Sequence, residues 1–298
     1  MEKNTSEMKM AKLDKSSEKA SQFKEMFGML IKNRAALVGM IIIIFLVIIA
    51  LIGKFIEPFD PNVGQLSESL QAPSSAHLLG TDEQGRDILS RIIDGTSISL
   101  RVGVTSVTFA LTIGIILGSI AGYYGKRVDM IIMRIMDMIL AFPSLLLAIA
   151  FMTALGRGID KAIIAISIVT IPEYARIVRS SILSIKESEY VQAARVIGNR
   201  DSAIIFKHIL PNVISPIVVR ATLGISSAIL DTAALGFLGL GVQPPAAEWG
   251  SMLGSGRTYF FNAPHIVLFP GIAITITVLA FNLFGDGLRD ALDPKLRN

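Results

Sequence analysis

Four long stretches of this sequence contain no charged residue, and their lengths limit the folds open to the chain. They cover residues 35–53, 102–124, 138–155 and 266–285. A helix needs about 20 apolar residues to cross the hydrocarbon of a bilayer, so each stretch predicts a membrane span. The mean hydropathy of +0.59 and the charged fraction of 17% exclude a soluble or disordered chain, because soluble domains carry about 25% charged residues.

Two further stretches predict spans although each carries charge. Residues 221–241 contain only Asp231, and residues 162–181 contain Glu173 near their centre, with two arginines toward one end. A carboxylate at the centre of a span opposes insertion by about 2.5–3.5 kcal/mol. Glu173 is expected to reach the headgroups from its end of the span. With both stretches included, the chain is an all-α integral membrane protein with six transmembrane helices.

Lys and Arg are unevenly distributed over the loops that six spans create. The tail of residues 1–34 carries eight and the loop of residues 176–212 carries six, whereas all the outer loops together carry six. Because basic residues gather on the cytoplasmic side, we expect a multi-pass plasma-membrane protein with both termini in the cytoplasm. The expected organisation is a tail over 1–34, a first span with an outer loop over 35–96, and a five-span core over 97–298.

The outer segment before the second span predicts a short amphipathic helix over residues 82–94. Thr81 and Gln84 have the spacing of a capping box. Gly95 can end the helix, because glycine readily adopts the left-handed conformation that follows a last helical turn. The acidic residues of this segment do not match a calcium-binding loop. We therefore expect a capped helix lying on the outer membrane surface.

The predicted cytoplasmic loop of about residues 180–212 contains a short helix with one small apolar face. Its apolar residues recur at i, i+3, i+4 and i+7, and they are Tyr190, Ala193, Ala194 and Ile197. This face fits a groove on a cytoplasmic partner. It fits equally a helix folded back against the ends of the chain's own spans.

The rest of this loop predicts a second short helix. Gly198 ends the first helix, Asn199 or Asp201 caps the second, and the second runs to Ile209. Pro211 then suits the first turn of the next span, where a proline is well tolerated.

Ionisable residues inside spans are expensive in lipid and indicate either function or pairing. Arg134 and Asp137 are three positions apart, which predicts an ion pair on one helix. Asp231 has no such neighbour. It either lines a translocation path or is satisfied by nearby serine and threonine hydroxyls or by a partner subunit.

Small and aromatic residues indicate further contacts. Gly114, Gly118 and Gly122 recur every fourth residue, which predicts a tight helix contact, either within the chain or at a dimer seam. Trp249, in the last outer loop, is typical of an interfacial anchor and alternatively of a contact with an outer partner.

The residues needed for catalysis or metal binding are sparse. The chain has no cysteine and three widely separated histidines, and it contains no set of nucleophile, base and acid. Neither Gly-Lys pair, at 53–54 and 125–126, is followed by Ser or Thr, so a nucleotide-binding P-loop is not expected. We predict no catalytic, metal or cofactor site on this chain, and no nucleic-acid partner.

Several motifs resemble those of the binding-protein-dependent ABC importer permeases. Ala193-Ala194, Gly198 and Leu210-Pro211 resemble the EAA loop of that family, with Gln192 where Glu is usual and His208 where Ile is usual. Motifs that resemble its dipeptide, oligopeptide and nickel branch occur at residues 77–87, 141–148, 235–241, 282–290 and 293–294. The long segment before the second span resembles the C-type permease of dipeptide and oligopeptide importers.

The resemblance implies a type I ABC importer permease fold and a non-catalytic subunit. A second, homologous permease would complete the translocation path, and two ATPase subunits would bind ATP and Mg²⁺ and contact the EAA loop. An extracytoplasmic peptide-binding protein would dock on the outer side. The residues that the resemblance assigns to the ATPase contact are Tyr190, Gln192, Ala193, Ala194, Gly198, Leu210 and Pro211.

Two alternatives concern the transported substrate and the energy source. Permeases of this branch import dipeptides, oligopeptides, nickel or metallophore complexes, and the sequence favours peptides through its resemblance to the C-type subunit. A secondary transporter driven by an ion gradient would be indicated by inverted repeats with broken midplane helices, and the sequence contains no convincing repeat.

Overall fold

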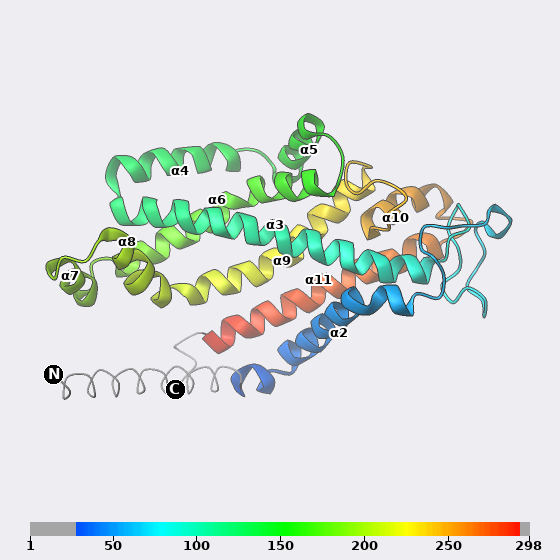
Figure 1. The fold of residues 1–298 in the computed structure, drawn as a ribbon, viewed down its shortest axis with the longest axis horizontal. Helices are drawn as coiled ribbons and strands as arrows, with labels where there is room; N and C mark the ends of the chain where they lie inside the picture. Colours follow the sequence, from blue (N-terminus) through cyan, green and yellow to red (C-terminus); the bar gives the residue numbers. More distant parts are fainter. Residues whose placement is uncertain (1–27, 293–298) are drawn as a thin grey trace.

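The computed structural model describes residues 28–292, and all the regular secondary-structure elements in that range are helices. The long helices lie side by side in an elongated bundle (Figure 1). They are α2 (Arg34–Ile56), α3 (Ile88–Tyr124), α6 (Ile159–Ile185), α9 (Ile214–Phe237) and α11 (His265–Leu292). The shorter helices are α4 (Lys126–Leu140), α5 (Ser144–Leu155), α7 (Glu189–Val196), α8 (Asp201–Ala203) and α10 (Trp249–Gly256).

The bundle has two distinct ends. Helices α7 and α8 lie at one end of its long axis, and α10 with the loop before α3 lies at the other (Figure 1). The start of α2 meets the end of α11, where the side-chain amide of Asn33 donates to Asp290. Buried residues of these two helices also contact Val219 at the start of α9. Residues 28–36 and the end of α11 are therefore on the α7 side of the bundle.

The expected all-α membrane fold is confirmed, with one difference in how the spans are built. Helices α2, α3, α9 and α11 are long and apolar enough to cross a membrane, and the bent pair α4–α5 is a fifth candidate. Helix α6 has 27 residues, more than the about 20 that a span requires. Its charged residues make it less apolar than the other long helices.

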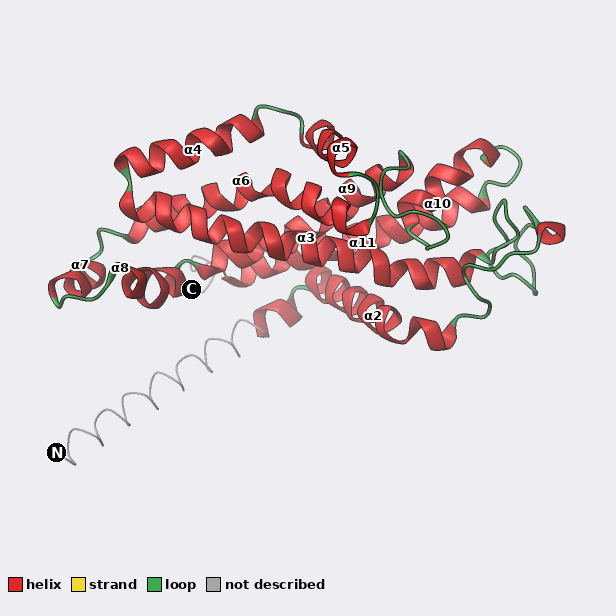
Figure 2. Cartoon of the chain, turned by 45° about the horizontal axis from the view of Figure 1, so that its top comes forward, coloured by secondary structure: helices red, strands yellow, loops and turns green. Residues whose placement is uncertain are grey.

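The predicted third span is not one continuous helix. Helices α4 and α5 meet at an angle of 90° across residues 141–143 (Figure 2). Pro143 lacks a backbone N–H, and it disfavours a helical conformation at the preceding Phe142. The uninterrupted span expected over residues 138–155 was therefore wrong, because the break falls inside that stretch.

Helix α3 also differs from its prediction, since one continuous helix contains most of the predicted amphipathic helix and the whole predicted second span. It begins at Ile88 rather than at residue 82, and Asp87 caps it by accepting a hydrogen bond of 2.8 Å from the Ser90 N–H. Thr81 cannot serve as the cap because its hydroxyl donates to the carbonyl of Glu68 and accepts from Gln71. Gly95 does not end the helix.

A side chain at Gly95 would lie 3.0 Å from the indole ring of Trp249. Glycine is thus used here for close packing instead of for helix termination. Trp249 itself is only 1% exposed, and its indole N–H donates to the carbonyl of Ile92 at 3.1 Å. Neither an interfacial anchor nor a contact with an outer partner describes this tryptophan.

The glycine stripe on α3 makes a contact within the chain. A Cβ atom at Gly114 would lie 2.5 Å from the Cβ of Tyr174, and one at Gly118 would lie 2.5 Å from the carbonyl oxygen of Ala175. Gly122 faces Ile182 in the same way. Helix α6 therefore occupies the face that a dimer seam would need, and the alternative of a tight internal contact is correct.

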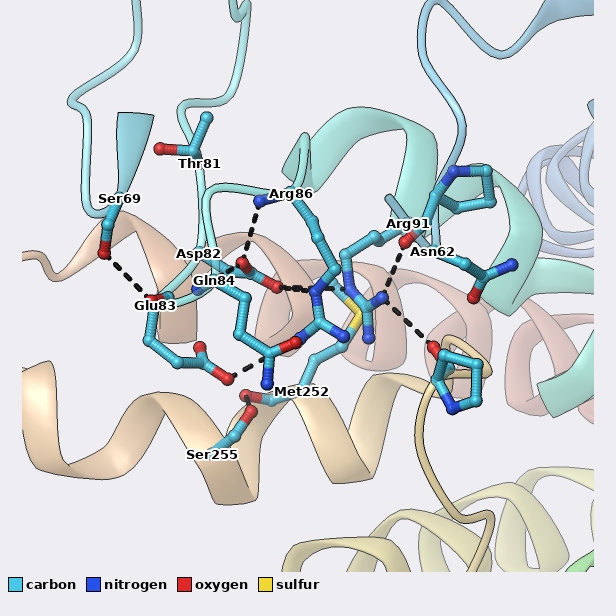
Figure 3. Close-up of polar contacts among 12 residues, drawn as sticks. Asn62, Ser69, Thr81, Asp82, Glu83, Gln84, Arg86, Arg91, Met252 and Ser255 are labelled. Carbon is cyan, nitrogen blue, oxygen red and sulfur yellow. Dashed lines mark hydrogen bonds and ion pairs between the residues drawn. The ribbon is translucent and has the colours of Figure 1, made fainter. Parts of the chain in front are cut away.

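A network of buried charges fixes the loop before α3 to the rest of the α10 end. The Asp82 carboxylate accepts from the Arg86 side chain at 2.7 Å, while Arg91 donates to the carbonyls of Pro61 and Pro245 (Figure 3). Because charge-assisted hydrogen bonds are the stronger ones, these contacts hold three separate segments together.

Glu248 fixes α10 against α9. It is 1% exposed, and its carboxylate accepts from the backbone N–H groups of Gly250 and Ser251, each at 2.7 Å. It packs so closely on Gly236 that a Cβ atom there would lie 2.1 Å from a carboxylate oxygen. Burial raises the pKa of Glu248 to about 7, against the two backbone hydrogen bonds, which lower it.

Candidate functional site

Helix α7 has one side packed into the molecule and one side exposed. Val191 is 0% and Ala194 is 4% exposed, and both belong to a buried cluster with isoleucines of the segment that follows α8. By contrast, Val196 is 87% and Ile197 is 79% exposed. An exposed apolar surface on a short helix at the end of the bundle is typical of an interaction site.

The small apolar face predicted from the sequence is divided between these two sides. Tyr190, Ala193 and Ile197 are exposed, whereas Ala194 is buried. The alternative of a helix folded back on its own chain is confirmed for Ala194, whereas Tyr190, Ala193 and Ile197 are exposed and the partner contact stays a prediction. Val196, which the sequence did not single out, lies beside Ile197 and is the more exposed of the two.

The turn after α7 requires glycine. Gly198 has a φ of +85°, a conformation that costs other L-residues about 1–2 kcal/mol. Its N–H donates to the Arg195 carbonyl at 2.9 Å, and the Asn199 N–H donates to the Ala194 carbonyl at 3.2 Å. The predicted helix end at Gly198 is confirmed.

The predicted cap of the second short helix was wrong. Residue 200 occupies the cap position of α8 and makes no side-chain capping bond. Asp201 is instead the first residue of α8, and its carboxylate accepts from the Tyr123 hydroxyl at 2.8 Å. The guanidinium of Arg195 lies 5.2 Å from the centre of the same Tyr123 ring. Tyr123 thus ties both short helices to the end of α3.

The segment between α8 and α9 is helical but irregular. Residues Ile204–Ile209 form a π-helix and Leu210–Asn212 a turn of 3₁₀-helix. Leu210 is half-buried and Pro211 is exposed. Pro211 precedes α9 and is not in its first turn, because α9 begins at Ile214.

Gln192, at the position where the family usually has Glu, is exposed on α7. Its amide donates to the carbonyl of Glu187 at 3.0 Å. Its hydrogen bond is thus a local one, to the backbone just before α7.

Two ion pairs connect α4 to α6. Asp137 accepts from Arg176 at 2.6 Å, and both carboxylate oxygens of Asp129 accept from Arg179. The ion pair predicted between Arg134 and Asp137 was wrong, because the partner of Asp137 comes from the neighbouring helix.

A cavity of about 330 Å³ lies between α6, α9 and the bend of α4–α5. Arg220 of α9 forms an ion pair with Glu173 of α6 in its wall. From the sequence, Glu173 is expected to reach the headgroups; in the structure its carboxylate instead pairs with Arg220 of another helix. Asp231 also lines this cavity and is half-buried.

Of the three hydroxyls expected to satisfy Asp231, those of Ser226 and Thr232 have other partners, whereas Ser227 lines the same cavity without a hydrogen bond to the carboxylate. Ser226 donates to Asn282 at 2.7 Å, and Thr232 donates to the carbonyl of Ala228 at 2.7 Å. Within residues 28–292, no side chain donates a hydrogen bond to the Asp231 carboxylate or forms an ion pair with it. In the same range, no three His, Cys, Asp or Glu side chains are grouped so as to hold a metal ion.

Comparison with known families gives two matches that cover different parts of the chain. Residues 114–298 match the family described as binding-protein-dependent transport system inner membrane component. Residues 21–73 match the N-terminal TM domain of oligopeptide transport permease C.

Several curated proteins are similar over nearly the whole chain. The dipeptide transport system permease protein DppC of Alkalihalophilus pseudofirmus is 50% identical over 93% of this chain and 91% of its own length. The di/tripeptide transport system permease protein DppC of Pseudomonas aeruginosa is 47% identical over 93% and 94%. The glutathione transport system permease protein GsiD of Pectobacterium atrosepticum is 45% identical over 93% and 92%.

Solved structures of the inward-facing MetNI methionine ABC transporter contain a similar chain. One native crystal form gives a TM-score of 0.57 at 19% identity, covering 69% of this chain and 98% of that one. A second crystal form gives 0.55 at 20% identity, covering 68% and 97%. At this level of identity the likeness concerns the fold, and the expected ABC importer permease fold is confirmed.

Proposed function

This chain belongs to the family of binding-protein-dependent transport system inner membrane components, and we propose that it is the C-type permease of an ATP-driven importer of dipeptides and oligopeptides. The relatives described above transport dipeptides, tripeptides or glutathione according to their names. They therefore support a peptide substrate over nickel or a metallophore. Membership of this family supports an ATP-driven importer over a secondary transporter.

A permease of this family works with ATPase and substrate-binding subunits. We propose more specifically that it pairs with one homologous permease and two ATPases, and that the ATPases bind ATP and Mg²⁺. In this arrangement the α7 end faces the cytoplasm, as the basic residues of residues 1–34 and 176–212 indicate. The α10 end then faces the peptide-binding protein.

The observation that carries the proposal is the two-sided packing of α7. Its exposed surface, formed by Tyr190, Val196 and Ile197, offers apolar contacts to an ATPase groove. Its buried surface, formed by Val191 and Ala194, is fixed to the rest of the chain. A helix held in this way transmits a displacement instead of absorbing it.

The path of that displacement follows the buried cluster. Val178 and Ile182 of α6 and Ile217 of α9 pack in the same cluster as Val191 and Ala194. Tyr123 adds α3 through its bond to Asp201. When the ATPases close, movement of α7 is passed to three long helices at once, two of which line the membrane cavity. This supplies the coupling between ATP hydrolysis and alternating access.

The proposal is tested with a tagged chain purified from its native membrane and then reconstituted. We expect a second permease and two ATPases to copurify, and we expect dialanine uptake into proteoliposomes to require ATP and the binding protein. Uptake that proceeds on a proton gradient without ATP would overturn the assignment, as would purification of the chain without any ATPase.

A further inference from the structure

The cavity between α6, α9 and the α4–α5 bend carries a polar stripe that the coupling mechanism does not use. Its polar side chains are Arg220, Ser227 and Asp231, and Gly224 lines the cavity between the first two, so the intervals are four, three and four residues. With 3.6 residues per turn, these positions fall on one face of α9. The stripe extends over about 16 Å of the helix, from Arg220 on the α7 side to Asp231 on the α10 side.

The charges in the cavity are not balanced within the described chain. Glu173 and Arg220 form an ion pair, which leaves the Asp231 carboxylate without a counter-charge in residues 28–292. A carboxylate in a span is costly in hydrocarbon, and such groups generally face a water-filled or ligand-filled space. The cavity, with a volume of about 330 Å³, supplies that space. Because the Asp231 carboxylate is not neutralised within residues 28–292, the site favours a cationic group near it.

Arg220 provides the opposite character at the other end of the stripe. A guanidinium has five N–H donors, so Arg220 can keep its bond to Glu173 and still bind a second carboxylate. The cavity therefore presents an acceptor for a cation and a donor for an anion along one helix face. A peptide with free termini has these two charges, about 7–11 Å apart in an extended di- or tripeptide. When such a peptide is bound, the Arg220 and Asp231 side chains span the rest of the about 16 Å between their backbone positions.

We propose that this cavity binds the terminal charges of the transported peptide, with Asp231 accepting from the α-ammonium group and Arg220 donating to the terminal carboxylate. The inference rests on the proposed peptide substrate and adds a binding site within the permease itself. Because both groups recognised are common to all linear peptides, the site is indifferent to side chains. It thus selects free-ended peptides as a class.

The test uses the complete importer in proteoliposomes, with both permeases, the ATPases and saturating unmodified binding protein. Uptake of labelled dialanine and ATP hydrolysis stimulated by the loaded binding protein are measured in parallel. Asp231→Asn is expected to lower uptake at least tenfold while stimulated ATP hydrolysis stays within twofold of wild type. Asp231→Glu, which keeps the charge, is expected to recover uptake to within threefold.

Thr222→Val is the matched control. Thr222 lies on the same helix but about 200° around it from Arg220, and its hydroxyl donates to the Val218 carbonyl at 3.0 Å. It does not line the cavity. This variant is expected to have wild-type uptake.

The carboxylate end is tested by replacing the ion pair as a unit. The double variant Glu173→Gln, Arg220→Gln replaces both partners of the ion pair, so it removes the guanidinium without leaving the Glu173 carboxylate unpaired. Uptake is expected to fall at least tenfold with ATP hydrolysis preserved. Wild-type uptake by this variant would overturn the role of Arg220.

Three results for Asp231→Asn would overturn the proposal. Unchanged uptake would remove any role for the carboxylate. Loss of uptake, ATP hydrolysis and thermal stability together would indicate a structural ion pair with the second permease. A defect confined to alanyl-lysine, with dialanine and alanyl-glutamate unaffected, would show that Asp231 contacts side chains and not the terminal ammonium. Failure of the wild-type importer to transport any of the three peptides would instead refute the proposed function.

Discussion

Replacing Ile197 by alanine separates the two sides of α7 most cleanly. Ile197 is 79% exposed, and burying an isoleucine side chain completely is worth about 1.5–3 kcal/mol. Truncation therefore removes about 1–2 kcal/mol of contact with an ATPase groove. That corresponds to a 5- to 30-fold weaker association. Because the side chain makes little contact within its own chain, the thermal stability of the permease is expected to stay unchanged.

Val191→Ala is the matched change on the opposite side of the same helix. Val191 is 0% exposed and packs in the buried cluster at the α7 end. Its truncation is expected to cost about 1.5–3 kcal/mol of stability through lost burial and a residual cavity. The melting temperature of the solubilised permease should fall, while the exposed surface of α7 is left chemically intact.

The assay combines ATPase binding to the permease in nanodiscs with thermal unfolding in detergent. The two variants should show opposite results: weaker binding with normal melting for Ile197→Ala, and lowered melting for Val191→Ala. The reasoning is refuted if Ile197→Ala binds the ATPase with wild-type affinity. It is refuted equally if both variants lower the melting temperature by the same amount.

Three other perturbations test the packing. Gly118→Ala places a Cβ atom 2.5 Å from the Ala175 carbonyl oxygen and is expected to lower the stability of the permease by about 1–3 kcal/mol through overpacking. The control Gly271→Ala, whose Cβ atom would have no neighbour closer than 3.9 Å, should melt like wild type. Equal melting temperatures of the two variants would contradict the tight α3–α6 contact. Ala194→Glu inserts a carboxylate at a position that is 4% exposed, so it is expected to detach α7 from the bundle and to lower transport. The detached helix should be cut more readily by a protease, whereas normal protease resistance would show that Ala194 faces outward. The raised pKa of Glu248, about 7 in the folded chain, means that the folded state holds this proton more tightly than the unfolded state. The contribution of Glu248 to stability is therefore fully present below about pH 4.5 and is lost, by up to about 3 kcal/mol, as the pH rises to about 7 and above. Glu248→Gln should flatten the pH dependence of melting between pH 5.5 and 8, and an unchanged slope would exclude Glu248 as its source.

Most of the spans were predictable from the sequence because they depend on composition over 20 residues, whereas the break within residues 138–155 was not predicted. The stretch over 35–53 lies inside α2, and the stretch over 266–285 lies inside α11. The helix end at Gly198 was predictable for a similar reason, since a left-handed residue after a short helix favours glycine locally. These features need no knowledge of what the chain packs against.

The features that the sequence did not predict depend on neighbours distant in the chain. Gly95 looked like a helix end, but its role is set by Trp249, which packs on it. Asp137 had a plausible partner three residues away, yet it pairs with Arg176 of another helix. Periodicity alone placed Ala194 on the same face as Ile197, and only the packing of the segment after α8 shows which of them is buried.

The central claim is that the exposed side of α7 contacts an ATPase subunit in the assembled importer. Since this chain has no cysteine, a single introduced cysteine can carry a thiol-reactive benzophenone photocrosslinker at one chosen position. The account predicts that the probe on Ile197→Cys forms an adduct with an ATPase subunit, and that a probe on Phe261→Cys, 93% exposed near the α10 end, does not. Absence of an ATPase adduct at position 197, or labelling of that position from the outer side of intact cells, would contradict it.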